Sequence, residues 1–290
     1  PAISANGTLT YTPNANANGS VTFNVTVIDD GGTSNSGDDR RTYSNAFTLT
    51  VNSVNDAPVL TDQSPDLRLN EDPGGSDTGM TISSLLVSGS VLETNDNVSP
   101  GTSTDNTAHE AIAITGTSVS AGTLQYSLDG GSSFADVGAV SNNSSLLLNS
   151  SDRLRLVSPT DYNGSAGTFT FRAWDQTTTA SGSSGNKVDT STNGGTSEFS
   201  SFADTATITV NAVNDEPTAS FQTPSAVNED ASGQTISSFA TPTNGATQLE
   251  GGQAFTYTVS RASGDSTSLF SVQPAISANG TLTYTPNANA

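Results

Sequence analysis

The chain has 290 residues and a formal net charge of −20, because 28 acidic side chains face only 8 basic ones. Such a surface repels phosphate backbones and anionic headgroups, so the composition argues against nucleic acid and membranes as partners. The sequence contains no cysteine, which excludes disulfides and metal–thiolate sites and leaves oxygen ligands for any bound metal. It has no apolar run of about 18 residues, so we expect no direct membrane insertion.

The two ends of the chain carry the same sequence. Residues 1–17 and 274–290 both read PAISANGTLTYTPNANA. The offset from Pro1 to Pro274 indicates one full period of a long tandem repeat plus a short overlap. Long tandem copies are typical of extracellular stalks, adhesins and fibres, and enzymes rarely consist of them.

Alternation of apolar and polar residues dominates the chain, whereas helical periodicity is almost absent. In residues 20–29, for example, Val21, Phe23 and Val25 alternate with threonine and asparagine. The same pattern predicts further strands over residues 46–51, 124–128, 133–137, 153–156, 167–174 and 205–210. Gly, Asn, Asp or Pro bounds each run, as turns require. We therefore predict an all-β fold of tandem antiparallel Greek-key β-sandwiches, arranged end to end.

A divergent inner repeat sets the predicted domain boundaries. The sequence VNSVNDAP at residues 51–58 returns as VNAVNDEP at residues 210–217, and an Asn-Glu-Asp triplet follows each, at residues 70–72 and 228–230. We predict one complete sandwich over residues 57–213. Residues 1–56 are then the C-terminal half of a sandwich, and residues 214–290 are the N-terminal half of the next one. Joined through the repeat, the two halves make a unit of about 115 residues, the usual sandwich size.

Acidic and amide side chains gather at strand ends and at the predicted joints. Two carboxylates about 4 Å apart repel by about 4 kcal/mol at an effective dielectric near 20. Calcium offsets such repulsion, because it accepts about six to eight oxygen ligands in flexible geometry. We therefore predict Ca²⁺ as the cofactor. The candidate ligands are Asp29, Asp30, Asn55, Asp56, Glu71, Asp72, Asp161, Asp175, Asn214, Asp215, Glu229 and Asp230.

Several of these motifs resemble those of known extracellular repeats. VNDAP at residues 54–58 and VNDEP at residues 213–217 look like the domain-joining motif of bacterial cadherin-like tandem repeats in giant secreted adhesins. TVIDDGG at residues 26–32 resembles the strand-end motif of that family, and the two Asn-Glu-Asp triplets resemble its acidic motif. Residues 124–141 and 169–178 resemble an immunoglobulin-like module of the same proteins.

This resemblance implies that calcium rigidifies the joints between successive sandwiches. At the joint after the complete sandwich, the implied ligands are Glu71, Asp161, Asp175, Asn214 and Asp215. At the joint after the split sandwich, they are Glu229, Asp29, Asp30, Asn55 and Asp56. The sequence departs from the pattern in two places. Gln-Thr rather than Gly-Gly follows Asp175, and the position matching Asp161 in the other copy is Asn or Ala, so the second site lacks one charge.

No constellation of catalytic residues is visible. His109 is the one histidine, and no nucleophile motif such as G-x-S-x-G lies near it. Trp174, the one tryptophan, is expected to pack in the core or at its edge. Asp129 and the two glycines after it are expected to close the hairpin between residues 124–128 and 133–137. We therefore do not expect an enzyme.

The leading prediction is a structural repeat segment of a giant bacterial extracellular adhesin or surface fibre, located outside the cell or on its surface. Its expected partners are neighbouring repeats of the same protein, joined covalently or as a homopolymer. One alternative is a glycan- or protein-binding sandwich module, with residues 177–195 as its site. Another is a filament subunit, assembled by half-domain or strand complementation between copies.

Overall fold

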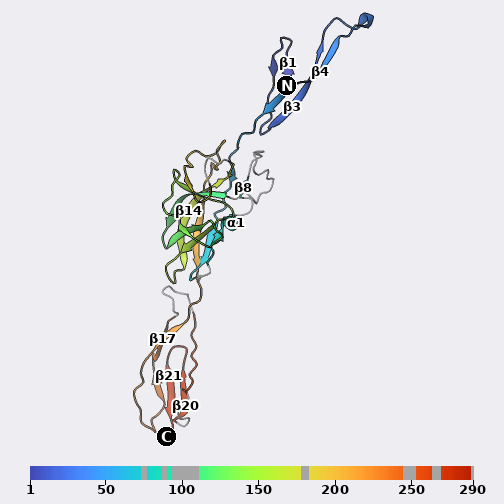
Figure 1. Ribbon diagram of the computed structural model, residues 1–290. Helices are drawn as coiled ribbons and strands as arrows, with labels where there is room; N and C mark the ends of the chain where they lie inside the picture. The colour runs from blue at the N-terminus through green and yellow to red at the C-terminus, as the bar shows by residue number, and fades with distance from the viewer. Residues whose placement is uncertain are drawn as a thin grey trace. The chain divides into compact units, whose positions relative to one another are not determined.

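The computed structural model describes residues 1–72, 77–86, 90–92, 111–177, 183–243, 253–262 and 269–288. This part of the chain is almost entirely antiparallel β-structure, which confirms the predicted all-β fold (Figure 1). Its one α-helix, α1 (Ile82–Leu85), begins after Thr81, whose Oγ1 accepts the Ser84 N–H as an N-cap. A 3-10 turn, η1 (Ser34–Ser36), is the other helical element.

The chain divides into two compact units. The first comprises Pro1–Arg68, Ser76–Val157 and Ala166–Ile208, and the second comprises Leu69–Gly75, Ser158–Ser165 and Thr209–Ala290.

The strands between Val59 and Asn211 form an immunoglobulin-like β-sandwich, which we call the central sandwich. Its larger sheet has the order β15 (Lys187–Val188), β12 (Ser145–Leu148), β9 (Ala111–Val119), β14 (Gly164–Trp174), β16 (Asp204–Asn211) and β6 (Asp66–Asn70). Its smaller sheet has the order β11 (Ala135–Asp136), β10 (Thr123–Ser127), β13 (Arg153–Val157) and β7 (Met80–Thr81). A short pair, β5 (Val59–Leu60) and β8 (Val91–Leu92), completes it.

The apolar core of the described chain is concentrated in the central sandwich. Alternate residues of β14, among them Phe169 and Phe171, are fully buried, as the two-residue period predicts. Trp174 is also buried and packs with Leu147 and Phe199, so it occupies the core position expected of it. All but four of the buried apolar side chains described lie between Leu60 and Val210. Each fully buried Phe or Leu contributes about 1.5–3 kcal/mol of burial free energy.

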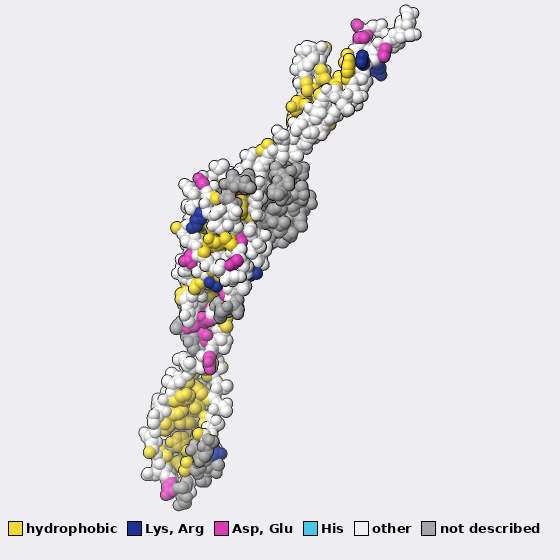
Figure 2. Space-filling view, viewed as in Figure 1, with side chains coloured by type: hydrophobic (Ala, Val, Ile, Leu, Met, Phe, Trp, Pro, Cys, Tyr) yellow, Lys and Arg dark blue, Asp and Glu magenta, His cyan; other side chains and the backbone are white. Residues whose placement is uncertain are grey.

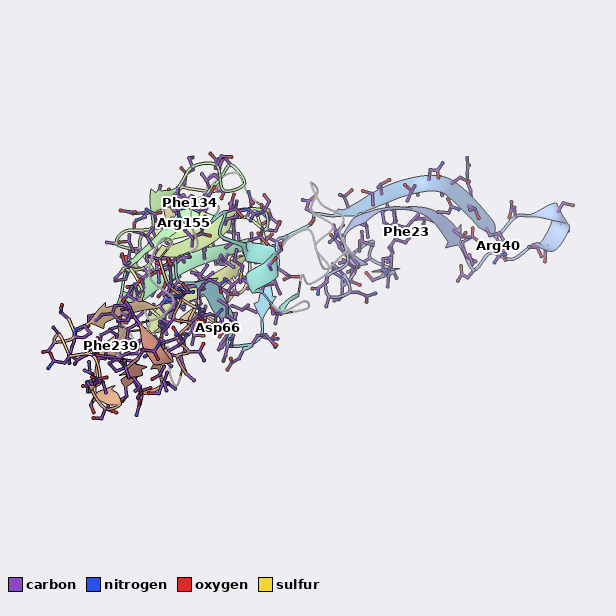
Figure 3. The ribbon with its side chains drawn as sticks, turned by 90° about the horizontal axis from the view of Figure 1, so that it is seen from below. Phe23, Arg40, Asp66, Phe134, Arg155 and Phe239 are labelled. Atoms are coloured by element: carbon purple, nitrogen blue, oxygen red, sulfur yellow. The ribbon has the colours of Figure 1, made fainter. Side chains whose placement is uncertain are left out.

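Cation–π and turn contacts organise the smaller sheet. The Arg155 guanidinium lies 3.6 Å from the Phe134 ring centroid. Figure 3 labels both residues. Asp129 accepts hydrogen bonds from the Ser133 N–H and Oγ–H in the turn between β10 and β11. The turn role predicted for Asp129 therefore matches its contacts.

The N-terminal segment of the chain, residues 1–56, has strands but no core. β3 (Gly19–Ile28) and β4 (Arg40–Val51) form a long hairpin, and β1 (Ala2–Ile3) pairs with β2 (Leu9–Thr10). On one face of the hairpin, Phe23 stacks on Phe47 with ring centroids 5.2 Å apart. The other face carries threonine pairs joined by hydroxyl hydrogen bonds, such as Thr22 with Thr48. None of these fully described residues is buried.

The C-terminal segment of the chain, residues 214–290, contains two small sheets. β17 (Thr218–Phe221) pairs with β19 (Ala240–Thr243), and the second sheet has the order β18 (Gln234–Ile236), β21 (Leu282–Pro286) and β20 (Phe270–Ile276). Only Ala240, Leu282 and Tyr284 are buried among its described apolar residues. Hydrophobic side chains gather instead on its surface (Figure 2).

Candidate metal centre

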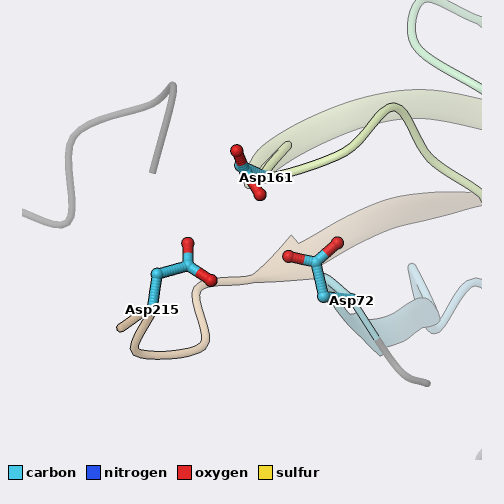
Figure 4. A group of neighbouring side chains, drawn as sticks. All are labelled: Asp72, Asp161 and Asp215. Atoms are coloured by element: carbon cyan, nitrogen blue, oxygen red, sulfur yellow. The ribbon is translucent and has the colours of Figure 1, made fainter. Parts of the chain in front are cut away.

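Three aspartates from separate parts of the sequence come together in the second unit. One carboxylate oxygen each of Asp72, Asp161 and Asp215 lies within 4.8 Å of the other two. Figure 4 shows the three side chains converging on one point. Asp72 follows β6, Asp161 lies in the turn before β14, and Asp215 belongs to the VNDEP segment after β16. This is the one group of at least three metal-binding side chains found in the described residues.

The backbone around the cluster is held in conformations that suit Asp. Asp72 has a φ of 46° and Asp161 a φ of 52°, in the left-handed region that Asp and Asn tolerate better than other residues. The Tyr162 N–H donates to the Pro159 carbonyl at 3.2 Å and closes the turn that carries Asp161. These turns set the directions of the two carboxylates.

Glu71 ties the segments of the cluster to one another. Its carboxylate accepts the Val213 N–H at 2.7 Å through Oε1 and the Asn163 Nδ2–H at 3.2 Å through Oε2. Its own N–H donates to the Asn211 carbonyl at 3.0 Å. Glu71 is completely buried, so these contacts replace the water that its carboxylate would otherwise bind. Glu71 is an anchor beside the cluster rather than one of its three members.

The cluster fits a hard cation. At 4.8 Å, two carboxylates repel by about 3 kcal/mol at an effective dielectric near 20. Asp72 is exposed and Asp161 and Asp215 are half-buried, so oxygen ligands face a position that solvent also reaches. Calcium takes carboxylate, carbonyl and water oxygens in flexible geometry, whereas magnesium requires near-ideal octahedral geometry. Asp72, Asp161 and Asp215 are the residues that would hold the ion.

Asp175 does not join this cluster, contrary to the predicted grouping. Asp161 precedes β14 and Asp175 follows it. A strand of 11 residues spans about 33 Å, at about 3.3 Å per residue. Asp175 instead accepts the Asn55 Nδ2–H at 3.0 Å and the Thr177 N–H at 2.9 Å, and it is buried. It therefore anchors the VNDAP segment at the opposite end of the strand.

The predicted grouping of Asp29 and Asp30 with Asn55 and Asp56 is wrong for the same reason. The hairpin register pairs Gly19 with Val51 and Ile28 with Arg40. Asp29 and Asp30 therefore follow the far end of the hairpin, whereas Asn55 and Asp56 follow its base.

The remaining predicted ligands lie elsewhere in the second unit. Glu229 and Asp230 are exposed in the turn before β18. The Asn214 Oδ1 accepts the Gln253 Nε2–H at 2.8 Å. Metal binding by these three residues stays a prediction.

A pocket at the base of the hairpin brings the VNDAP segment together with asparagines of the turn before β3. It has a volume of about 190 Å³, and Asn16, Asn18, Val54 and Asp56 are among its lining residues. Asn16 has a φ of 57°, close to that of Asp161. The Ala17 N–H donates to the Asn14 carbonyl at 3.2 Å, as the Tyr162 N–H does in the other turn. Asn-Gly follows both turns, at residues 18–19 and 163–164, and this shared pair is the sequence signal that relates the two turns.

Three aspartates away from the cluster have shifted pKa values. Hydrogen bonds from the Ser191 side chain and N–H lower the pKa of Asp189. Hydrogen bonds from the Ser133 side chain and N–H lower the pKa of Asp129 to about 2. Burial raises the pKa of Asp152 above its ordinary value, although its carboxylate accepts the Asn149 N–H at 2.7 Å. His109 lies outside the described residues.

Comparison with known proteins supports the fold of the N-terminal part. Residues 1–38 match the family model described as a bacterial Ig domain. No curated protein and no solved structure matches the chain. In the described part of the chain, no helix has the length and apolar character needed to cross a membrane.

Proposed function

We propose that this chain is a structural, non-enzymatic repeat segment of a bacterial extracellular adhesin or surface fibre. The Ig-like all-β fold is typical of such modules, and bacterial Ig domains are often parts of surface proteins. The cadherin-like joint motifs and the repeated ends of the chain support the same assignment. Neighbouring repeats of the same protein are its proposed partners, with a surface glycan or protein as the target of adhesion.

Calcium is the proposed cofactor of the joint after the central sandwich. The observation that carries this proposal is the convergence of Asp72, Asp161 and Asp215 within 4.8 Å. A bound Ca²⁺ would offset the repulsion among the three carboxylates. It would also fix the VNDEP segment to the turns that carry Asp72 and Asp161. The ion would thus stiffen the joint.

Calcium titration calorimetry tests the proposal. The unchanged chain should bind Ca²⁺ more tightly than Mg²⁺, and Asp161→Asn should weaken Ca²⁺ binding by at least about tenfold, because it removes one of the three charges. Asp62→Asn is the matched control, because Asp62 is an exposed aspartate outside the cluster. Equal Ca²⁺ affinity in both variants would overturn the assignment of the site.

Limited proteolysis tests the mechanical role separately. With Ca²⁺ bound, residues 212–217 should resist cleavage, and chelation should expose them. An identical cleavage pattern with and without chelator would contradict a stiffened joint even if Ca²⁺ binds.

A further inference from the structure

The linker that leads into the central sandwich carries an asparagine whose amide group is bound by that sandwich. Asn55 belongs to the VNDAP segment, residues 54–58. Its Nδ2 donates to the Asp175 carboxylate at 3.0 Å and to the Ser197 carbonyl at 3.1 Å. A side-chain amide has two N–H hydrogens, so these two acceptors use both. A carboxylate in place of this amide group would meet two acceptors and no donor.

The backbone of the same linker is bound at a second point. The Ala57 N–H donates to the Gly195 carbonyl at 2.8 Å, and Pro58, the next residue, is buried. The linker is therefore fixed through a side chain and through its main chain at once. We call the two hydrogen bonds of Asn55 and the one of Ala57 the entry latch.

The central sandwich holds the acceptor carboxylate of the entry latch in place. Asp175 directly follows β14 and is only 3% exposed. Its Oδ1 accepts the Thr177 N–H at 2.9 Å and the Thr177 hydroxyl at 2.6 Å, while its Oδ2 accepts the Asn55 amide. The Asp175 N–H donates to the Glu198 carbonyl at 3.1 Å. Uncharged donors thus satisfy both oxygens of a buried carboxylate, as burial of a charge requires.

The turn that supplies the two carbonyl acceptors is built onto the core. The Ser197 N–H donates to the Gly194 carbonyl at 3.1 Å, and the Gly194 N–H donates to the Phe199 carbonyl at 2.8 Å. Phe199 is buried in one cluster with Trp174, and the Trp174 indole N–H donates to the Glu198 carboxylate at 3.1 Å. The receptor for the linker is therefore formed by the sandwich itself.

The linker at the other end of the sandwich is surrounded by different groups. There the VNDEP segment, residues 213–217, brings Asp215 to the carboxylates of Asp72 and Asp161. Those carboxylates repel one another, which a cation offsets. At the entry latch, by contrast, a carboxylate faces N–H and O–H donors that already satisfy it. The two ends of the sandwich thus present opposite electrostatic situations to the same type of linker.

We propose that the entry latch fixes the VNDAP linker to the central sandwich without a metal ion. The sandwich then has one linker that is held directly and one whose stiffness depends on calcium. Removing calcium would loosen the VNDEP linker and leave the VNDAP linker in place. The proposal does not depend on calcium binding at the Asp72 cluster, because every contact of the entry latch is a hydrogen bond within the chain.

Amide hydrogen exchange of Ala57, measured by NMR on the 290-residue chain, tests the proposal. The Ala57 N–H is itself one of the three bonds, so its exchange rate reports opening of the entry latch. The Ala57 amide should be protected in the unchanged chain, and a calcium chelator should change its exchange rate by less than about twofold. Amides of β9 provide the reference for a folded central sandwich.

Asn55→Asp separates the entry latch from a metal site. The introduced carboxylate would face the Asp175 carboxylate and the Ser197 carbonyl, so exchange of the Ala57 amide should accelerate by about tenfold or more, with or without Ca²⁺. A metal ion at this position would act in the opposite direction, because a carboxylate oxygen is at least as good a calcium ligand as an amide oxygen. Asn52→Asp is the matched control, since Asn52 is exposed just before the linker, and it should leave the Ala57 amide protected.

Four results would overturn the proposal. They are an unprotected Ala57 amide in the unchanged chain, loss of its protection on chelation, protection that Ca²⁺ restores in Asn55→Asp, and equal acceleration in Asn52→Asp. Calcium affinity of the Asp72 cluster is measured separately by calorimetry with Asp161→Asn, so failure of one proposal is distinguishable from failure of the other.

Discussion

The central sandwich and the two terminal segments, residues 1–56 and 214–290, share the alternating strand pattern but differ in how much of it is buried. Phe169 on β14 is fully buried, whereas Phe23 on β3 is only half-buried and stacks on Phe47. Local pairing is enough to form the β3–β4 hairpin. A core forms only where two complete sheets cover each other. Alternation in the sequence therefore specifies a strand and its two faces. It does not specify whether other residues bury the apolar face.

Truncating a buried aromatic side chain should have the largest effect among the tests of this comparison. Phe169→Ala should lower the free energy of unfolding of the central sandwich by about 3–5 kcal/mol, because it leaves a cavity. In a dilute sample, Phe23→Ala should leave that free energy unchanged. Denaturant unfolding followed by Trp174 fluorescence measures both variants. Equal losses would show that the hairpin already belongs to the same core.

A second test compares two glycines on one strand. Gly164 has a φ of 112° and Gly167 a φ of 122°, so alanine is strained at both. A Cβ at Gly167 would also lie 2.1 Å from the Ser118 carbonyl oxygen, whereas nothing lies within 4 Å of one at Gly164. Gly167→Ala should therefore destabilise the central sandwich by about 1–3 kcal/mol more than Gly164→Ala does. Matching unfolding midpoints would contradict the close approach of β9 and β14.

A third test compares the two matching glutamates. Glu71→Gln should lower the free energy of unfolding by about 1–3 kcal/mol, because an amide group would face one of two donors that the carboxylate now satisfies. Glu229→Gln should have no such effect in a dilute sample, since Glu229 is exposed there. Thermal unfolding of both variants provides the measurement. A loss of stability in dilute Glu229→Gln would show that this residue is already anchored.

The smallest expected effect is a pH dependence in the central sandwich. The pKa of Asp129 is lowered from 3.8 to about 2 in the folded chain. Its ionised form therefore adds stability above pH 3.8, and this contribution is lost as the pH falls through about 2. Asp129→Asn should make the free energy of unfolding fall less steeply as the pH is lowered into the acid range. An unchanged pH dependence would show that Asp129 does not contribute to it.

The alternating pattern was enough to predict the all-β fold and its longer strands. Prediction from the sequence failed where the resemblance grouped residues that an extended strand holds apart, as with Asp161 and Asp175 on either side of β14. The length of the alternating run, at about 3.3 Å per residue, already indicates that residues at its two ends lie far apart. The anchoring role of Glu71 could not be predicted, because its donors, the Val213 N–H and the Asn163 amide, are far from it in the sequence.

Hydrogen exchange tests the proposed calcium joint most directly. Amide exchange of residues 211–217 would be compared with Ca²⁺ present and after chelation, with β9 and β14 as the internal reference. We predict that the amides of residues 211–217 are more protected with Ca²⁺ bound, while the reference strands do not change. Amides that exchange at the same rate with and without Ca²⁺ would contradict a stiffened joint.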